Sequence, residues 1–262
     1  MEYEALTGRN LLKEEFDSVT DEALAELGIN AEAQRMDSSL VGSFIKQMSR
    51  LELIAKVLQN FYRDLPEEEQ ARWKSRLASY IENEAEHIAY QLKRAEVEEH
   101  LQKLGNLLFE LHQAYEGDAK IRAGKSYQHL SRILLEQYNI TVRPGQTEQT
   151  TIAVKPAKEI SPASLQNPAD DTATFRHKNG ENYKGDLLNV AETCAPENPV
   201  QLLTDISVYP NVAADDVILA ERVSQLKERT GVEELIVDGN YSGEKSEAAC
   251  NEVGFTLRAH PE

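Results

Sequence analysis

The fold is decided by one short stretch, Glu234-Leu235-Ile236-Val237-Asp238-Gly239-Asn240-Tyr241-Ser242-Gly243. A continuous apolar run bounded by turn residues is typical of a strand buried on both faces. Asp238 then lies at the carboxyl end of that strand, which is the edge where open α/β sheets bind ligands. An aspartate at this place is either a metal ligand or the cap of the next helix. The stretch by itself favours the cap.

The residues on either side of this strand predict a mixed sheet. Asn179-Gly180 separates two strand-like runs and is a strong hairpin signal. Gly231 is placed to end the amphipathic helix that leads into the buried strand. The other expected elements are strands at Ala173–Lys178, Tyr183–Thr193, Leu202–Tyr209 and Val253–Ala259, and helices at Ala214–Thr230 and Glu244–Val253. Strands and helices in this order indicate an α/β fold.

The first half of the chain is mostly helical by its apolar period. A helix is expected from Leu11 to Leu27, and Gly28 ends it. The next segment, Ile29–Ser39, is only weakly strand-like and by propensity is a loop. From Leu40 to Tyr138 the period is helical throughout and predicts four helices packed as a bundle, the third a single long helix running to Gly117. Prolines punctuate Ile140–Asp170, which predicts a connector with at most short extended pieces.

Composition excludes several classes of protein. The chain has 262 residues, 40% hydrophobic and 28% charged, as expected of a globular protein. No apolar run approaches about 20 residues, so we expect no membrane span. The acidic start does not resemble a signal peptide, and two cysteines in no metal-like spacing fit a reducing cytoplasm. The net charge of −17 counts against a simple nucleic-acid binder, which would be basic.

Common catalytic motifs are missing from the sequence. We find no Walker loop, no Gly-rich dinucleotide fingerprint, no Gly-x-Ser-x-Gly elbow and no His-Glu-x-x-His pair. Four of the six histidines lie on expected helices at spacings that do not suit paired metal ligands. Cys194 and Cys250 are expected to be small buried residues, not nucleophiles.

Three stretches resemble a known family. The first is Gln34-Arg35-Met36-Asp37-Ser38-Ser39, and the second is the hairpin region from Ala173 to Pro199 with its Phe175-Arg176-His177-Lys178-Asn179-Gly180 core. The third runs from Leu226-Lys227-Glu228-Arg229-Thr230-Gly231 to Asp238-Gly239-Asn240-Tyr241. Together they look like the DDE transposases of bacterial insertion sequences. They are most similar to the subgroup with a long helical insertion after the first catalytic aspartate.

The resemblance implies an α/β fold, an RNase H-like mixed sheet with a large all-helical insertion. Its expected parts are residues 1–39 with the first catalytic strand, the insertion at 40–138, the connector at 139–170 and the rest of the core at 171–262. Asp37 and Asp238 would be catalytic metal ligands, holding Mg²⁺ or Mn²⁺ together with a third acid, a glutamate. The implied activity is DNA cleavage and strand transfer. The implied partners are transposon ends and target DNA, with homodimerisation a further expectation.

Several residues depart from the family pattern. Ser39 stands where the family has threonine, so a hydroxyl is kept. The third acid is not identified: Glu244 and Glu247 come too soon after Asp238, and Glu262 is the last residue. We therefore expect an internal piece of a longer transposase. The resemblance suggests DNA contacts for a few basic residues, which are Arg35, Arg176, Lys178 and Lys184.

Two other functions stay open at this point. The chain could be a truncated, non-catalytic transposase that acts as a dimerisation or interaction protein. It could also be an acidic α/β domain that binds a small ligand at Asp238. The separation of Asp37 and Asp238 in space is the observation that best distinguishes the three.

Overall fold

The computed structural model describes residues 6–43, 46–142, 150–254 and 256–259. The chain divides into two compact units, each described here by itself. The first, the sheet unit, is discontinuous and consists of Met1–Val41 and Gly185–Glu262. The second, the helical unit, is Gly42–Lys184, so it contains most of the predicted insertion, the proline-rich connector and the first strand of the hairpin.

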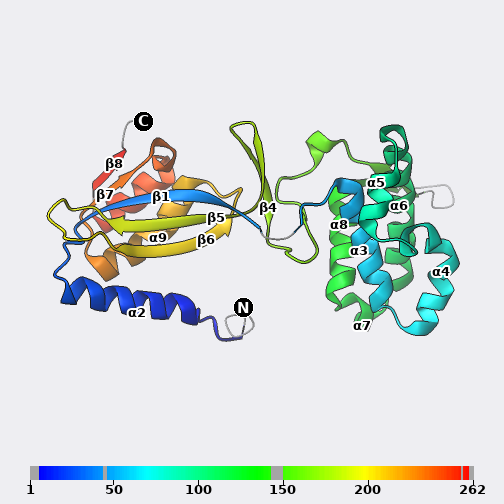
Figure 1. Ribbon diagram of the computed structural model, residues 1–262, viewed down its shortest axis with the longest axis horizontal. Coiled ribbons are helices and arrows are strands. Elements are labelled where there is room, and N and C mark those ends of the chain that lie inside the picture. The colour runs from blue at the N-terminus through cyan, green and yellow to red at the C-terminus, as the bar shows by residue number, and fades with distance from the viewer. Residues whose placement is uncertain (1–5, 44–45, 143–149, 255, 260–262) are drawn as a thin grey trace. The chain divides into compact units, whose positions relative to one another are not determined.

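The main sheet has six strands, in the order β4-β5-β1-β7-β8 with β6 also paired to β5, and all but β4 (Thr174–Lys178) belong mainly to the sheet unit (Figure 1). The strands of the sheet unit are β1 (Ala33–Gly42), β5 (Glu181–Thr193), β6 (Leu203–Pro210), β7 (Glu234–Val237) and β8 (Thr256–Ala259). The β5–β6 pair is antiparallel, whereas β1–β7 and β7–β8 are parallel. Parallel neighbours need crossover connections. In the second half of the chain one helix connects β7 to β8 and another connects β6 to β7, whereas the connection from β1 to β7 includes the helical unit and strands β5 and β6. The fold is therefore mixed α/β with a mixed sheet.

The two crossover helices are α9 (Asp215–Thr230) and α10 (Glu244–Val253), and they pack against each other. Both end at a glycine in the left-handed region, Gly231 with φ 70° and Gly254 with φ 73°, where other residues are strained. Their apolar faces close a core with residues of the sheet, whose buried members are Met36, Ala191, Leu219, Val223, Leu226, Val232, Leu235, Val237, Tyr241 and Cys250.

Helix α2 (Leu11–Glu26) packs on β6 largely through charged groups. Asp205 of β6 is buried and binds Arg222 through two hydrogen bonds of 2.7 and 2.9 Å. Lys13 of α2 reaches the same carboxylate at 3.1 Å. Arg229 binds Asp17 of α2 at 2.6 Å. Because these side chains are mostly shielded from water, the ion pairs fix α2 more firmly than exposed pairs would.

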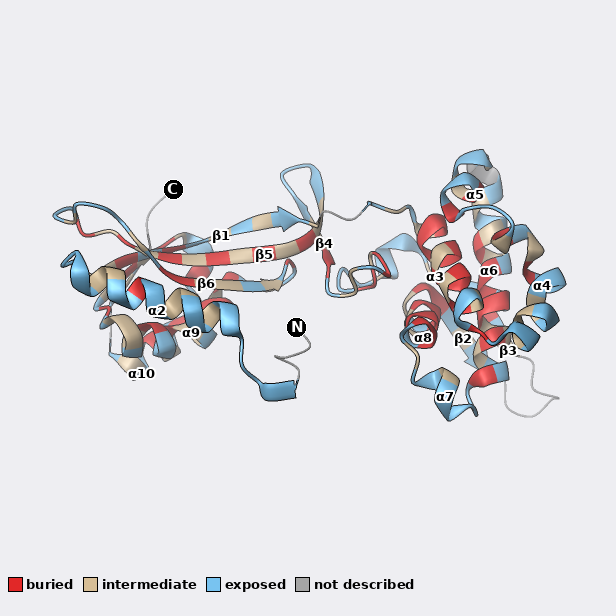
Figure 2. Cartoon of the chain, turned by 60° about the horizontal axis from the view of Figure 1, so that its bottom comes forward, coloured by how far each residue is buried: buried red, intermediate tan, exposed pale blue. Residues whose placement is uncertain are grey.

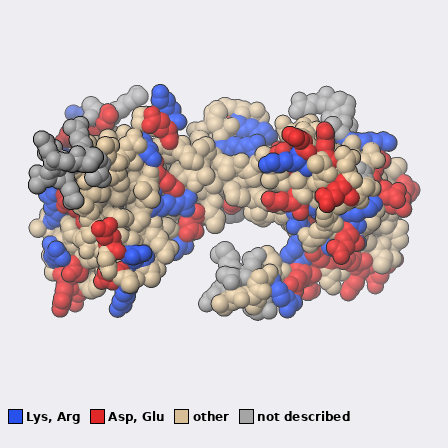
Figure 3. Space-filling view, turned by 180° about the vertical axis from the view of Figure 1, so that it is seen from behind, with Lys and Arg blue, Asp and Glu red and all other residues tan. Residues whose placement is uncertain are grey.

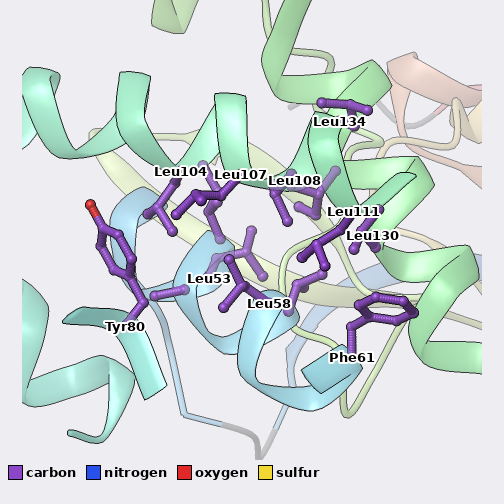
Figure 4. Packing of buried hydrophobic residues seen from close by; sticks show 14 of the residues in the cluster. Leu53, Leu58, Phe61, Tyr80, Leu104, Leu107, Leu108, Leu111, Leu130 and Leu134 are labelled. Carbon is purple, nitrogen blue, oxygen red and sulfur yellow. The ribbon is translucent and has the colours of Figure 1, made fainter. Parts of the chain in front are cut away.

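Helices α3–α8 make up most of the helical unit. They are α3 (Arg50–Asp64), α4 (Glu67–Ile81), α5 (Ala85–Gln91), α6 (Arg94–Tyr115), α7 (Ala119–Arg122) and α8 (Lys125–Gln137). Their leucines and aromatic rings meet in one core; Figure 4 shows Leu53, Leu58 and Phe61 of α3 pointing at residues of α6 and α8. Figure 2 shows the buried residues as stripes along these helices, as the helical period predicts.

Short strands complete the helical unit. Strands β2 (Tyr138–Val142) and β3 (Thr150–Val154) pair antiparallel, and a 3-10 turn, η1 (Ala157–Glu159), follows. Strand β4 (Thr174–Lys178) neighbours β5. Between them Asn179 has φ 55° and Gly180 has φ 82°, the two positive angles that a type I′ hairpin turn requires. The hairpin predicted from Asn179-Gly180 is confirmed.

Most predicted elements are present, and three expectations are wrong. Ile29–Ser39 is not a loop, because β1 begins at Ala33 and is the central strand of the path β4-β5-β1-β7-β8. The helical block does not begin at Leu40, because β1 continues to Gly42 and α3 begins at Arg50. The third helix is two helices, because Leu92 and Lys93 are extended and the backbone N–H of Lys93 donates to Glu96, which restarts the helix.

Polar contacts explain why residue propensity predicts a loop where the structure has strand β1. Gln34 and Met36 point into the protein, with exposed fractions of 0% and 2%. The Gln34 amide nitrogen donates to Ala31 O and Thr230 Oγ1, and its oxygen accepts from Thr204 Oγ1 at 2.6 Å. A buried glutamine is tolerated in a central strand because its side-chain hydrogen bonds are made, and two of the three partners, Thr204 and Thr230, are distant in sequence. No local pattern reports such partners.

Candidate functional site

Asp37 and Asp238 lie on neighbouring parallel strands. In the β1–β7 pair Arg35 is opposite Ile236. Continuing that register by two residues, 35 + 2 = 37 and 236 + 2 = 238, puts Asp37 opposite Asp238. Adjacent strands are about 4.8 Å apart, so both carboxylates belong to the same edge of the sheet. Asp37 is exposed and Asp238 is partly exposed, so both are accessible to a ligand from solvent.

Each aspartate is also held by the backbone. Asp37 Oδ1 accepts a 2.7 Å hydrogen bond from the N–H of Ser38. Asp238 Oδ1 accepts one of 2.8 Å from the N–H of Asn240, which caps the 3-10 turn η2 (Gly239–Tyr241). The cap role expected for Asp238 is therefore present. Asp238 Oδ2 accepts a second, longer bond of 3.4 Å from Asn240 Nδ2. Each carboxylate oxygen has two lone pairs, so acceptor capacity remains for a cation.

A buried tyrosine lies beside this edge. Tyr241 is fully buried, and its hydroxyl donates a 2.7 Å hydrogen bond to Asn189 Oδ1 of β5. Burial is the main reason that its pKa is well above the ordinary value; a hydrogen bond with Ser38 lowers that pKa. The negative charges of Asp215, Asp37 and Asp238 raise it further, so all three carboxylates lie within electrostatic range of one hydroxyl.

Two more aspartates come from the first turn of α9. Ser38 Oγ donates to Asp215 Oδ1 at 2.9 Å, and Asp215 is buried. Asp216 faces Gly243, where an added Cβ would lie 2.9 Å from Asp216 Oδ2. Acids in the first turn of a helix meet its positive end, which stabilises their charge. Sequence reasoning missed Ser38, Asn189 and Asp215; the only local signal was the pair of acids at the start of a predicted helix.

The carboxylate oxygens of Asp37 and Asp238 are suitable ligands for a hard divalent cation, but two carboxylates are fewer than the three that the family uses. Carboxylate oxygens are the ligands that Mg²⁺ and Mn²⁺ prefer. Within residues 6–43, 46–142, 150–254 and 256–259, however, no group of three or more His, Cys, Asp or Glu side chains could hold a metal. Glu244 and Glu247 are exposed on α10, and Glu262 lies outside the described residues. The structure brings together two candidate ligands and does not supply the third.

Of the four candidate DNA-binding cations, Arg35 belongs to the sheet unit and Arg176, Lys178 and Lys184 belong to the helical unit. Arg35 binds Glu192 of β5 at 2.6 Å, a contact that raises the Arg35 pKa. Arg176 is half-buried, and Lys178 is exposed near the hairpin turn. Lys184 is half-buried and donates to Met48 O at 2.8 Å. On the face shown in Figure 3, acidic and basic side chains are interspersed within each unit.

Neither cysteine has the features of a nucleophile. Both are free thiols, and burial raises the pKa of Cys250 to about 11. Burial is also the main cause of the raised pKa of Cys194, although the charge of Arg35 lowers it. Both therefore stay protonated near neutral pH, where only the thiolate would react.

Comparisons with known proteins do not add an assignment to this geometry. No family model, curated protein or solved structure matches the chain. Among the helices that the structure describes, none combines the length and the apolar character needed to cross a bilayer. The function is therefore argued from the arrangement of Asp37, Asp238 and the residues around them.

Proposed function

We propose that the chain provides part of an RNase H-like catalytic core for divalent-metal-dependent DNA cleavage and strand transfer of the DDE transposase type. The observation that carries the proposal is the β1–β7 register, which pairs Arg35 with Ile236 and, continued by two residues, would set Asp37 opposite Asp238 at one edge of the sheet. The strand order supports it: β1 is central, β5 and β6 lie on one side, and the parallel strands β7 and β8 lie on the other. In this proposal the helices of residues 42–184 are the family's insertion.

Asp37 and Asp238 would hold Mg²⁺ or Mn²⁺, and a third acid would complete the site. When bound, such ions activate an attacking hydroxyl or water and stabilise the leaving oxygen of a phosphodiester. The chain's own residues position the ligands. The N–H groups of Ser38 and Asn240 orient the two carboxylates, and the Tyr241–Asn189 hydrogen bond holds the turn that follows Asp238.

DNA, a homodimer and a cytoplasmic location are parts of the same proposal. Phosphate contacts would come from Lys178 and Arg176 near the hairpin turn, whereas Arg35 would first have to leave Glu192. The net charge of −17 opposes tight, non-specific DNA binding by this chain alone. We therefore expect weak DNA binding that depends strongly on salt.

A non-catalytic interaction protein is the second candidate. It is favoured by one observation: the described residues include no third acid close enough to Asp37 and Asp238 to complete a metal site. Mg²⁺ tolerates little loss of ligand geometry, so two carboxylates alone would bind it weakly. Both candidates share the fold and differ in whether a metal at this edge drives DNA cleavage.

Thermal melting with and without Mn²⁺ tests the metal site, with a nicking assay on supercoiled DNA beside it. Metal bound only by the folded state should raise the melting temperature of the wild type. Asp37→Asn and Asp238→Asn should each abolish that rise. An asparagine oxygen still accepts the Asn240 hydrogen bond, so Asp238→Asn should keep the fold.

Asp64→Asn is the matched control, because Asp64 is an exposed aspartate at the end of α3 in the other unit. It should keep the full Mn²⁺ effect. An equal Mn²⁺ effect in the wild type and in Asp238→Asn would remove Asp238 from the site and overturn the proposed function. A metal effect without nicking would favour the non-catalytic candidate.

A further inference from the structure

A cavity of about 420 Å³ lies within the helical unit. Leu53 of α3, Phe175 of β4 and the segment from Ile160 to Leu165 give it apolar walls. Three cationic side chains belong to the same lining: Lys158, which is exposed, and Arg50 and Lys184, which are half-buried. Cavities of this size, mostly apolar with a few convergent polar groups, are typical of small-molecule sites.

The two half-buried cations of the lining, Arg50 and Lys184, donate hydrogen bonds to uncharged backbone oxygens. Arg50 donates from its two Nη atoms to the backbone oxygens of Lys155 and Gln137, at 2.8 Å each. Lys184 donates to Met48 O and keeps two further N–H groups. No Asp or Glu is among the described residues that line the cavity. The nearest acid acting on Lys184 is Glu52, whose charge Lys46 already offsets at 2.9 Å.

Burial lowers the pKa of both half-buried cations, Arg50 and Lys184. In each case burial is the largest effect on the pKa. A half-buried cation without a counterion is unfavourable, because water has been removed from it and no opposite charge replaces that water. An anion in the cavity would lower this free-energy cost. It would contact Lys184 directly, and its negative charge would also stabilise the nearby guanidinium of Arg50.

A buried amide oxygen in the same lining lacks a hydrogen-bond partner. Gln137 is 3% exposed, and its side-chain Oε1 is buried with no partner among the residues that the structure describes. Arg50 Nε is likewise buried without a partner among these residues. Buried polar atoms are nearly always hydrogen-bonded, so two orphans beside one cavity indicate a missing ligand group.

We propose that this cavity binds a small organic anion, a carboxylate on an apolar body. Lys184 would contact the carboxylate through its free N–H groups, and the Gln137 amide would turn to hydrogen-bond the same group. The apolar body would lie against Leu53, Leu165 and Phe175. This site is distinct from the aspartates of the sheet unit and does not depend on the proposed DNA chemistry.

Calorimetric titration of the full chain with sodium octanoate tests the proposal. Octanoate should bind the wild type and Lys184→Arg, whereas Lys184→Gln should weaken binding by about tenfold or more, since one charge-assisted hydrogen bond is lost. Lys103→Gln is the matched control, because Lys103 pairs with Glu99 on the outer face of α6 in the same unit. It should bind octanoate as the wild type does.

Gln137→Met gives a second, independent measurement. It removes the buried, unpaired Oε1 of Gln137, so the protein without octanoate should melt at a higher temperature than the wild type. It also removes the amide that would hydrogen-bond the carboxylate, so the affinity for octanoate should fall. Equal binding of octylammonium or octanol would overturn the anionic part of the proposal, and equal binding of inorganic phosphate would overturn the apolar part. Absence of any octanoate heat up to about 10 mM, enough to detect a Kd of about 1 mM, would overturn it entirely.

Discussion

The hydroxyl of Ser38 donates a 2.9 Å hydrogen bond to Asp215, a residue 177 positions away in the chain. This bond joins the central strand β1, one residue after Asp37, to the first turn of α9. Asp215 is buried, so its charge depends on this donor and on the positive end of the helix. The position of Asp37 is thereby coupled to the start of the crossover helix.

Ser38→Ala should lower the free energy of unfolding by about 1–3 kcal/mol, because a buried carboxylate loses a donor. Urea unfolding followed by circular dichroism measures this. The neighbouring Ser39 is exposed, so Ser39→Ala should change the free energy by less than about 0.5 kcal/mol. Equal effects of the two changes would show that the Ser38–Asp215 bond does not stabilise the sheet unit.

Tyr241→Phe should destabilise the protein by about 1–3 kcal/mol, because Asn189 Oδ1 would be left buried without its donor. The ring volume is unchanged, so the effect reports the hydroxyl alone. Tyr90 is 88% exposed, and Tyr90→Phe serves as the control with little expected change. If Tyr241→Phe left the stability unchanged, another donor would have to hydrogen-bond Asn189 Oδ1.

Asp205→Asn should reduce stability by about 3–5 kcal/mol at pH 7, because Arg222 would be left half-buried without its ion pair. Burial by itself would raise the pKa of Asp205, but hydrogen bonds and charge from Arg222 and Lys13 outweigh it and hold the pKa below 3.8. A carboxyl whose pKa is lowered by folding stabilises the protein above its unfolded pKa. That contribution is lost as the pH falls through the lower, folded pKa.

The stability difference between wild type and Asp205→Asn should therefore be constant above about pH 5 and shrink below about pH 4. Urea unfolding at a series of pH values from neutral to acidic measures the difference. A difference that grows toward acid pH would contradict the assigned direction of the pKa shift.

Gly105→Ala should destabilise the helical unit although alanine is the better helix former. A Cβ at Gly105 would lie 2.4 Å from Cε1 of Tyr138, a ring that is buried and donates its hydroxyl to Leu101 O. Overpacking of this kind costs about 1–3 kcal/mol, more than the roughly 1 kcal/mol gained in helix propensity. Gly117 has open space around it, so Gly117→Ala is the control. Thermal melting of both variants should show a loss only for Gly105→Ala.

Local sequence pattern was enough for elements whose cause is local. Asn179-Gly180 predicts a hairpin because both residues accept positive φ, and Gly231 ends α9 for the same reason. The apolar run before Asp238 predicts a strand, and β7 is present, but the expected burial on both faces is wrong: Leu235 and Val237 are buried, whereas Ile236 on the other face is half-buried. Helix α10 has the bounds expected from its period, Glu244–Val253. In each case the residues that predict the turn, strand or helix end lie within that element or within a few residues of it.

Contacts between distant segments were decided only by the tertiary structure. Strand β1 looks like a loop by propensity, and it is a strand because Thr204 and Thr230 satisfy Gln34. The β1–β7 register pairs Arg35 with Ile236, and it is a property of the sheet; its continuation by two residues brings Asp37 level with Asp238.

The same is true of the cavity at Lys184 and Gln137, whose walls come from five separate parts of the chain. The physical reason is that side-chain period reports which face of a segment is buried. It carries no information on the identity of the group that covers that face.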